Sequence, residues 1–139
     1  MTENEKYELI KTALLARGAS YSPYSGFAVG AALLTSDGEI FTGANIESAS
    51  YSPTVCAERV AFFNAVHSGK RDFKAIAIVG GPASEEVKSF TAPCGVCRQV
   101  MAEFCNADFE IILYNGKELA TYTFAELLPE SFGKNNLKQ

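Results

Sequence analysis

Three chemically costly side chains interrupt an apolar stretch at residues 54–63, TVCAERVAFF. They are the thiol of Cys56, the carboxylate of Glu58 and the guanidinium of Arg59. Two more thiols follow at Cys94 and Cys97, in the sequence PCGVC. If a helix begins at Cys94, these two thiols lie one turn apart on one face and can hold a single ion. The same Cys-x-x-Cys spacing also serves dithiol redox sites, so the pair alone leaves both chemistries open.

The other cysteines and the single histidine decide how many ligands a zinc ion could have. Cys105 would lie about 12 Å further along the same helix axis, at ~1.5 Å per residue, which is far beyond the zinc–sulfur distance of about 2.3 Å. It is more simply a small apolar core residue, and His67 is expected to be exposed or to cap a helix end. Cys56, Cys94 and Cys97 then remain as three ligands with a fourth position open, which is typical of catalytic rather than structural zinc.

Two interpretations other than a catalytic zinc site remain open. One is a binding module stabilised by zinc, and the other is a thiol redox protein built on Cys94 and Cys97. Taken singly, Cys56 could be a buried structural thiol and Glu58 a solvated surface acid. Neither reading requires Glu58 two residues after Cys56, which weighs against both.

The chain resembles the zinc-dependent nucleobase deaminases, whose signature is a His or Cys followed by x-Glu and later by Pro-Cys-x-x-Cys. Cys56-Ala57-Glu58 and the segment from Pro93 to Cys97 fit it. The segments FAVGAAL, NIESASY, CAER, PCGVCRQ and ELLPESFG resemble, in that order, the blocks of the small homotetrameric cytidine deaminases, over residues 24–133. The resemblance implies one Zn²⁺ per subunit and hydrolytic deamination of cytidine and 2′-deoxycytidine to uridine and 2′-deoxyuridine in pyrimidine salvage, with release of ammonia.

The resemblance also assigns roles around the metal. Glu58 would be the general acid–base that moves protons between water, N3 of cytosine and the departing amino group. Three thiolates give a zinc site a formal charge of −1, which makes a poor Lewis acid. Two helix N-termini and hydrogen bonds from Arg59 to the cysteine sulfurs could offset that charge. The alternative for Arg59 is a surface ion pair with an acid such as Glu103.

Substrate contacts rest on the resemblance alone. It implies that Phe27 packs on the pyrimidine, that Asn45 and Glu47 hold the ribose 3′-hydroxyl, and that the backbone of Ala57 binds the base edge. Core packing for Phe27 and a polar loop at 45–47 are the plainer alternatives. Three further aromatic residues match family positions that line an active site: Tyr24, Tyr51 and Phe132. Of these, Tyr51 and Phe132 match positions that reach into the active site of a neighbouring subunit. Pro53 departs from the pattern, in the loop that enters the segment 55–67.

The elements that must position these residues follow from hydrophobic periodicity and turn signals. Their order predicts a central sheet with helices packed on it, hence an α/β fold. The resemblance sharpens this to a three-layer α-β-α fold with a five-stranded mixed sheet and helices on both faces, in a single domain over residues 1–139. The sequence predicts helices at 3–17, at 55–67, from Cys94 onward and after Thr123. Gly18 is expected to end the first helix, and Thr123 and Glu126 form a capping box at the start of the last one. Strands are predicted at 28–35, at 39–45, at 73–81 and twice within 109–122.

Composition limits the partners. The chain has 139 residues, 47% of them hydrophobic, and a formal net charge of −4. Without a cluster of basic residues, an RNA- or DNA-editing deaminase is disfavoured and a nucleoside substrate is expected. The N-terminal sequence lacks the features of a secretory signal and no apolar run could span a bilayer, so a cytoplasmic protein without a membrane partner is expected. A deaminase of a cytosine-bearing antibiotic such as blasticidin S remains a rival.

Overall fold

The computed structural model describes residues 1–137, so the last two residues of the predicted domain lie outside it. Five strands form one sheet in the order β2-β1-β3-β4-β5, in which only β3 and β4 run parallel and all other neighbours are antiparallel. No helix within residues 1–137 is long and apolar enough to cross a membrane. The elements are α1 (Glu3–Arg17), β1 (Phe27–Thr35), β2 (Ile40–Ala44), α2 (Ala57–His67), β3 (Phe73–Pro82), α3 (Gly95–Phe104), β4 (Glu110–Tyr114), β5 (Leu119–Thr123), α4 (Phe124–Leu127) and the short 3₁₀ helix η1 (Lys134–Asn136).

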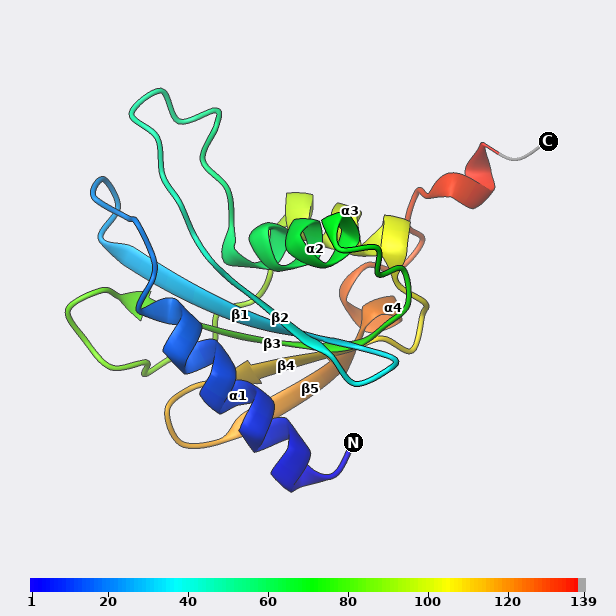
Figure 1. Cartoon of the computed structure of the whole chain (residues 1–139), viewed down its shortest axis with the longest axis horizontal. Helices are drawn as coiled ribbons and strands as arrows, with labels where there is room; N and C mark the ends of the chain where they lie inside the picture. Colours follow the sequence, from blue (N-terminus) through cyan, green and yellow to red (C-terminus); the bar gives the residue numbers. More distant parts are fainter. Residues whose placement is uncertain (138–139) are drawn as a thin grey trace.

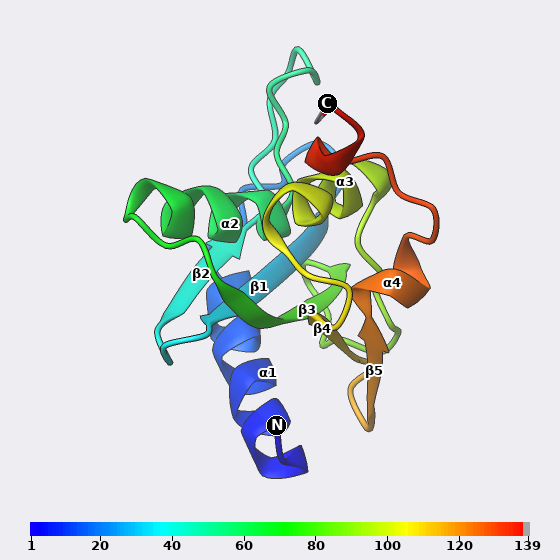
Figure 2. The same ribbon diagram turned by 90° about the vertical axis from the view of Figure 1, so that its right-hand side faces the viewer.

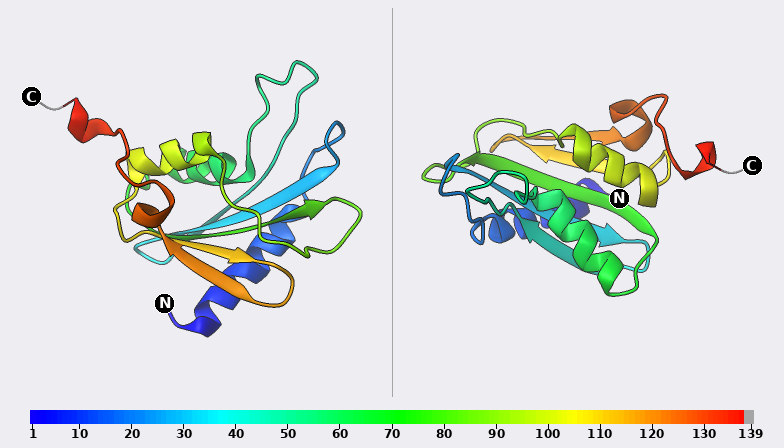
Figure 3. Two further views of the ribbon diagram at one scale, coloured as in Figure 1. Left: turned by 180° about the vertical axis from the view of Figure 1, so that it is seen from behind. Right: turned by 90° about the horizontal axis from the view of Figure 1, so that it is seen from above.

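Helices cover both faces of this sheet. Helix α1 lies against one face, and α2 and α3 lie against the other (Figures 1 and 2). Side chains alternate along the central strands, so that Ala31 and Leu33 pack with α2 whereas Ala32 packs with α1. The view from above in Figure 3 shows α2 and α3 side by side across the sheet. The predicted three-layer fold with a five-stranded mixed sheet is confirmed.

The helix predicted over 55–67 begins two residues late, at Ala57. Val55 is held in an extended bridge to Ile46, with reciprocal backbone hydrogen bonds of 2.9 and 3.0 Å. Cys56 is therefore the extended N-cap of α2, with φ −74° and ψ 155°. Cys94 is likewise the N-cap of α3, with φ −70° and ψ 168°. Neither cysteine side chain caps its own helix, which leaves both sulfurs available to each other.

Most other local predictions are confirmed. Thr123 and Glu126 form the expected capping box at the start of α4. Cys105 ends α3 as its C-cap and packs, half-buried, against the core beneath α2 and α3. Gly18 does end α1, but with a right-handed φ of −62° rather than the left-handed conformation that favours glycine at helix ends.

Two glycines on neighbouring strands allow the helices to approach the sheet closely. A Cβ placed on Gly43 of β2 would lie 2.3 Å from the carbonyl oxygen of Ala57 and 2.6 Å from the nitrogen of Ala61. A Cβ on Gly30 of β1 would lie 2.1 Å from the carbonyl oxygen of Ala13, on the opposite face of the sheet. The first turn of α2, which contains Glu58, is thus in backbone contact with β2.

Candidate active site

The three cysteines predicted as ligands meet at the N-terminal ends of α2 and α3. The Sγ atoms of Cys56 and Cys94 are 3.6 Å apart, and those of Cys94 and Cys97 are 3.5 Å apart. All three lie within 4.8 Å of one another, and they form the one candidate metal-binding group of this kind within residues 1–137. Tetrahedral zinc with bonds of about 2.3 Å separates its sulfur ligands by about 3.8 Å. The spacing and the donor atoms therefore fit a zinc ion.

The surroundings of these thiols favour negative charge at Cys56. Hydrogen bonding from Cys97, followed by contacts with Arg59 and Cys94, lowers the pKa of the Cys56 thiol to about 5 despite its partial burial. The pKa of Cys97 is raised, because its thiol proton bonds to Cys56 and because burial and the nearby Glu58 oppose a second charge. Even without a metal, the cluster holds a thiolate near neutral pH, which is the form that binds zinc.

Glu58 lies in the first turn of α2 and is only 4% exposed. Burial raises the pKa of its carboxyl to about 7, and the negative charge of Cys56 adds to this effect. The backbone N–H of Glu58, the Cys97 thiol and the positive charge of Arg59 partly oppose this rise in pKa. A buried carboxyl whose pKa is near neutral can both accept and donate a proton at working pH, as a general acid–base must.

The Arg59 side chain lies over the cysteine cluster. Its Nη2 atom donates a hydrogen bond to Cys56 Sγ over 3.4 Å. Among the described residues it forms no ion pair with Glu103, and its buried Nε has no hydrogen-bond partner. A cation in this position reduces the negative charge of the thiolates at the cost of one unsatisfied donor.

Asn45 and Glu47 lie beyond the end of β2, next to the start of β1. Asn45 is buried, and its side chain continues the ladder between the strands: Oδ1 accepts from Val29 N over 2.9 Å, and Nδ2 donates to Phe27 O over 2.8 Å. Glu47 Oε1 accepts from the backbone nitrogens of Tyr24 and Ser25 over 3.0 and 3.1 Å. Both polar side chains are fixed against the backbone that leads into Phe27.

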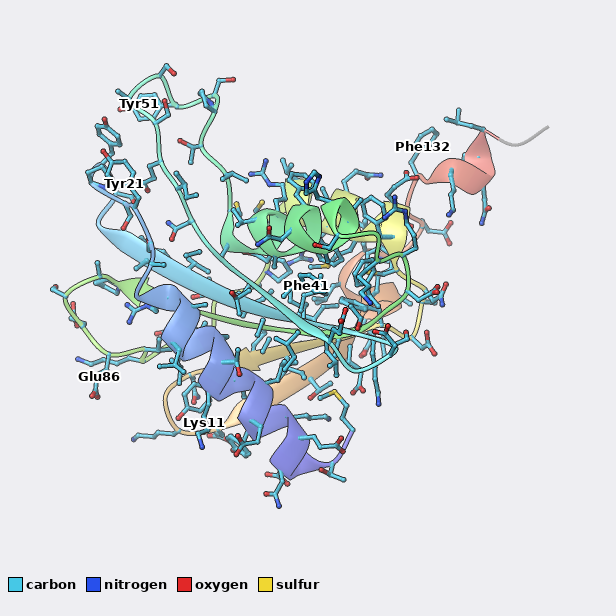
Figure 4. All side chains as sticks on the ribbon, viewed as in Figure 1. Lys11, Tyr21, Phe41, Tyr51, Glu86 and Phe132 are labelled. Carbon is cyan, nitrogen blue, oxygen red and sulfur yellow. The ribbon has the colours of Figure 1, made fainter. Side chains whose placement is uncertain are left out.

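The predicted aromatic contacts fall into two groups. Phe27 is the first residue of β1 and lies on the sheet face covered by α2, with 40% of its surface exposed. Tyr24 and Tyr51 pack edge to face, with ring centroids 6.4 Å apart, and line a hollow of about 240 Å³ together with Glu47. Phe132 lies beyond α4, far from Tyr51 in Figure 4. The structure brings Tyr24, Tyr51 and Glu47 together, but it leaves Phe132 apart from them.

The remaining predicted residue, Ala57, is the first residue of α2 and is fully buried next to Glu58. Sequence reasoning missed Ser25, whose hydroxyl donates to Glu47 Oε2 and accepts from Phe27 N over 3.0 Å. It also missed Ser20, whose hydroxyl donates to Asn45 Oδ1 over 2.6 Å. The only signal was the presence of hydroxyl groups in SYSPYSGF, and nothing local indicates partners more than 20 residues away.

Comparisons with known proteins agree with this geometry. Residues 3–113 match the family model described as the cytidine and deoxycytidylate deaminase zinc-binding region. The cytidine deaminase of Sporosarcina psychrophila is 50% identical over 134 residues, which cover 94% of this chain and 93% of that protein. The blasticidin-S deaminase of Bacillus cereus is 39% identical over 110 residues, which cover 77% of this chain and 78% of that protein.

A solved structure supports the same relationship. The crystal structure of cytidine deaminase from Burkholderia pseudomallei superposes with a TM-score of 0.84 at 44% identity, covering 95% of this chain and all of that one. Sequence and fold thus agree over nearly the whole chain. With its cysteine cluster, buried glutamate and three-layer fold, the chain belongs to the cytidine and deoxycytidylate deaminase family.

Proposed function

We propose that the chain is a zinc-dependent cytidine deaminase, which hydrolyses cytidine and 2′-deoxycytidine to uridine and 2′-deoxyuridine with release of ammonia. The observation that carries this proposal is the meeting of three cysteine sulfurs, within 4.8 Å of one another, beside the buried carboxyl of Glu58. A structural zinc site needs a fourth protein ligand, and the described residues offer none to this cluster. A redox dithiol needs no buried acid.

Cys56, Cys94 and Cys97 would hold one zinc ion per chain. When bound, zinc supplies the Lewis acidity that makes water nucleophilic near neutral pH. Arg59 and the N-termini of α2 and α3 lower the energy of the thiolates, so that less negative charge is passed to the metal.

Glu58 would carry the protons of the reaction. A carboxyl with a pKa of about 7 can take a proton from the attacking water and return it to N3 of cytosine or to the leaving amino group. Its place in the first turn of α2 fixes it next to the metal ligands, because Cys56 and Glu58 are held by the same helix start. The backbone of Ala57 lies between them, where it would bind the base edge.

The substrate contacts form a second part of the proposal. Phe27 would form one wall of the base site, with Asn45 and Glu47 at the sugar and Tyr24 at the rim. Glu47 is an anion, and hydrogen bonds from the side chain and backbone of Ser25 keep its pKa below the ordinary value. A carboxylate at this position favours hydroxyl groups and disfavours phosphates, which supports nucleosides in pyrimidine salvage rather than nucleotides or nucleic acids.

The exposed aromatics support an assembly. Tyr51 is 73% exposed and Phe132 is 60% exposed. As part of the proposal, residues 1–139 form one catalytic domain that acts in the cytoplasm as a homotetramer, in which these two side chains complete the site of a neighbouring subunit.

Loss of cytidine absorbance on addition of the purified protein tests the proposal. Turnover that disappears with a zinc chelator and returns with Zn²⁺ is the expected result. The assay is repeated with blasticidin S, because one relative carries that name. A preference for blasticidin S would mean that the substrate is the antibiotic and not the nucleoside. No turnover of either substrate by zinc-loaded protein would refute the proposal.

A further inference from the structure

The hydroxyl of Ser25 joins two residues of the proposed substrate site. It accepts a hydrogen bond from Phe27 N over 3.0 Å, and it donates one to Glu47 Oε2. A backbone N–H can only donate and a carboxylate can only accept, so the single hydroxyl proton has one possible direction. Ser25 thus ties the carboxylate at the sugar side to the backbone of the residue proposed to pack on the base.

These contacts leave the Glu47 carboxylate with few free hydrogen-bond acceptor positions. An ionised carboxylate has about four acceptor positions. Two are filled on Oε1 by the nitrogens of Tyr24 and Ser25, and a third on Oε2 by the Ser25 hydroxyl. About one acceptor position, on Oε2, remains for a ligand.

The same count can be made for Asn45. Its partners Val29 N and Phe27 O are a backbone donor and a backbone acceptor, which fixes which end of the amide is oxygen. Oδ1 is filled by Val29 and by the hydroxyl of Ser20, and Nδ2 retains one N–H. Asn45 and Glu47 together therefore offer one donor and one acceptor, which is the complement of a single hydroxyl group.

We propose that Ser25 is a positioning residue of the sugar subsite: it holds Glu47 so that its last acceptor position, paired with the free N–H of Asn45, receives one sugar hydroxyl. This inference rests on the proposed function. Without the Ser25 hydroxyl, the carboxylate is held only through Oε1, by the nitrogens of Tyr24 and Ser25, and Oε2 is no longer fixed in the direction of the sugar. Phe27 N also loses its acceptor, but the pairing of Phe27 with Pro82 in the sheet keeps the base contact in place.

The test compares Ser25→Ala with the unchanged chain on cytidine and on 3′-deoxycytidine, which lacks the hydroxyl. Loss of one hydrogen bond to a charged group predicts a KM for cytidine that is raised roughly tenfold, with kcat changed less than about twofold. The KM for 3′-deoxycytidine should not change. Ser25→Thr, which keeps the hydroxyl, should restore the KM for cytidine. Ser68→Ala is the matched control, because its hydroxyl bonds to Asn64 O at the far end of α2.

A double variant separates positioning from general stability. If Ser25 acts through Glu47, Ser25→Ala should have no further effect on KM in a Glu47→Gln background. Equal effects on both substrates, additive effects in the double variant, or a result equal to Ser68→Ala would overturn the inference. No turnover of cytidine by the unchanged chain would overturn the proposed function and this inference with it.

Discussion

Replacement of Gly43 by alanine should damage the active site through the backbone of α2. The added Cβ would lie 2.3 Å from Ala57 O and 2.6 Å from Ala61 N, whereas ordinary contacts begin at 3.4 Å. Both neighbours are helix backbone and cannot rotate away, so the first turn of α2 must shift by about 1 Å. Cys56 and Glu58 flank Ala57, so they must shift as well.

The size of the effect follows from two opposing terms. Overpacking costs roughly 1 to 3 kcal/mol, and contacts this short with fixed backbone belong near the upper end. Alanine also lowers the conformational entropy of the unfolded chain relative to glycine, which offsets up to about 1 kcal/mol of this loss of stability. The expected loss of about 2 kcal/mol should lower Tm by about 7 °C in a domain of this size. A misplacement of about 1 Å can reduce catalysis roughly 100-fold.

Gly30→Ala provides the control. Its Cβ would lie 2.1 Å from Ala13 O, so it should destabilise the fold similarly but displace α1 instead of α2. Thermal unfolding, zinc content and kcat per folded molecule are measured for both variants. The expected result is a similar loss of Tm in both, with a fall in kcat only for Gly43→Ala. Equal kcat values in the two variants would refute the link between this strand contact and the site.

Three further outcomes are expected. Glu58→Gln should retain its fold and zinc but lose roughly 100- to 10,000-fold in kcat, and Glu103→Gln on α3 should not. In zinc-free protein, burial raises the pKa of Glu58 to about 7 from 4.5. Its contribution to the free energy of unfolding is therefore complete below about pH 4.5, and about 3 kcal/mol is lost as the pH rises through 7. Denaturant unfolding should show this loss in the unchanged chain but not in Glu58→Gln. Arg59→Ala should bind zinc yet lose roughly 10- to 100-fold in activity, and unchanged turnover would show that the arginine does not tune the thiolates.

The sequence alone predicted the elements that carry strong local signals. Hydrophobic periodicity and turn residues located the five strands and the helices α1, α2 and α3 to within about two residues, and the capping box placed α4, but the short 3₁₀ helix η1 was not predicted. The late start of α2 was missed because it depends on the bridge between Val55 and Ile46, a tertiary contact that local propensity does not contain.

In the active site, too, residues with a local sequence signal could be predicted and residues that depend on tertiary contacts could not. Cys56, Cys94 and Cys97 could be grouped from spacing because zinc chemistry restricts the possible partners. The hydroxyls of Ser20 and Ser25 could not be assigned, since their partners Asn45 and Glu47 come close only when the loop before β1 folds against the end of β2. The hydrogen bond from Arg59 to a cysteine sulfur was expected from the resemblance and from the charge of three thiolates, whereas its unsatisfied Nε was not expected.

The two N-cap cysteines have a topological consequence. Cys56 and Cys94 are 38 residues apart in the chain. An ion bound by both closes that segment into a ring, as a disulfide would, and the chain-entropy relation for a loop of this length gives about 4 kcal/mol. The ring encloses α2 and β3, one helix and the central strand of the sheet. Zinc affinity and resistance to unfolding are thereby two measurements of a single linked equilibrium.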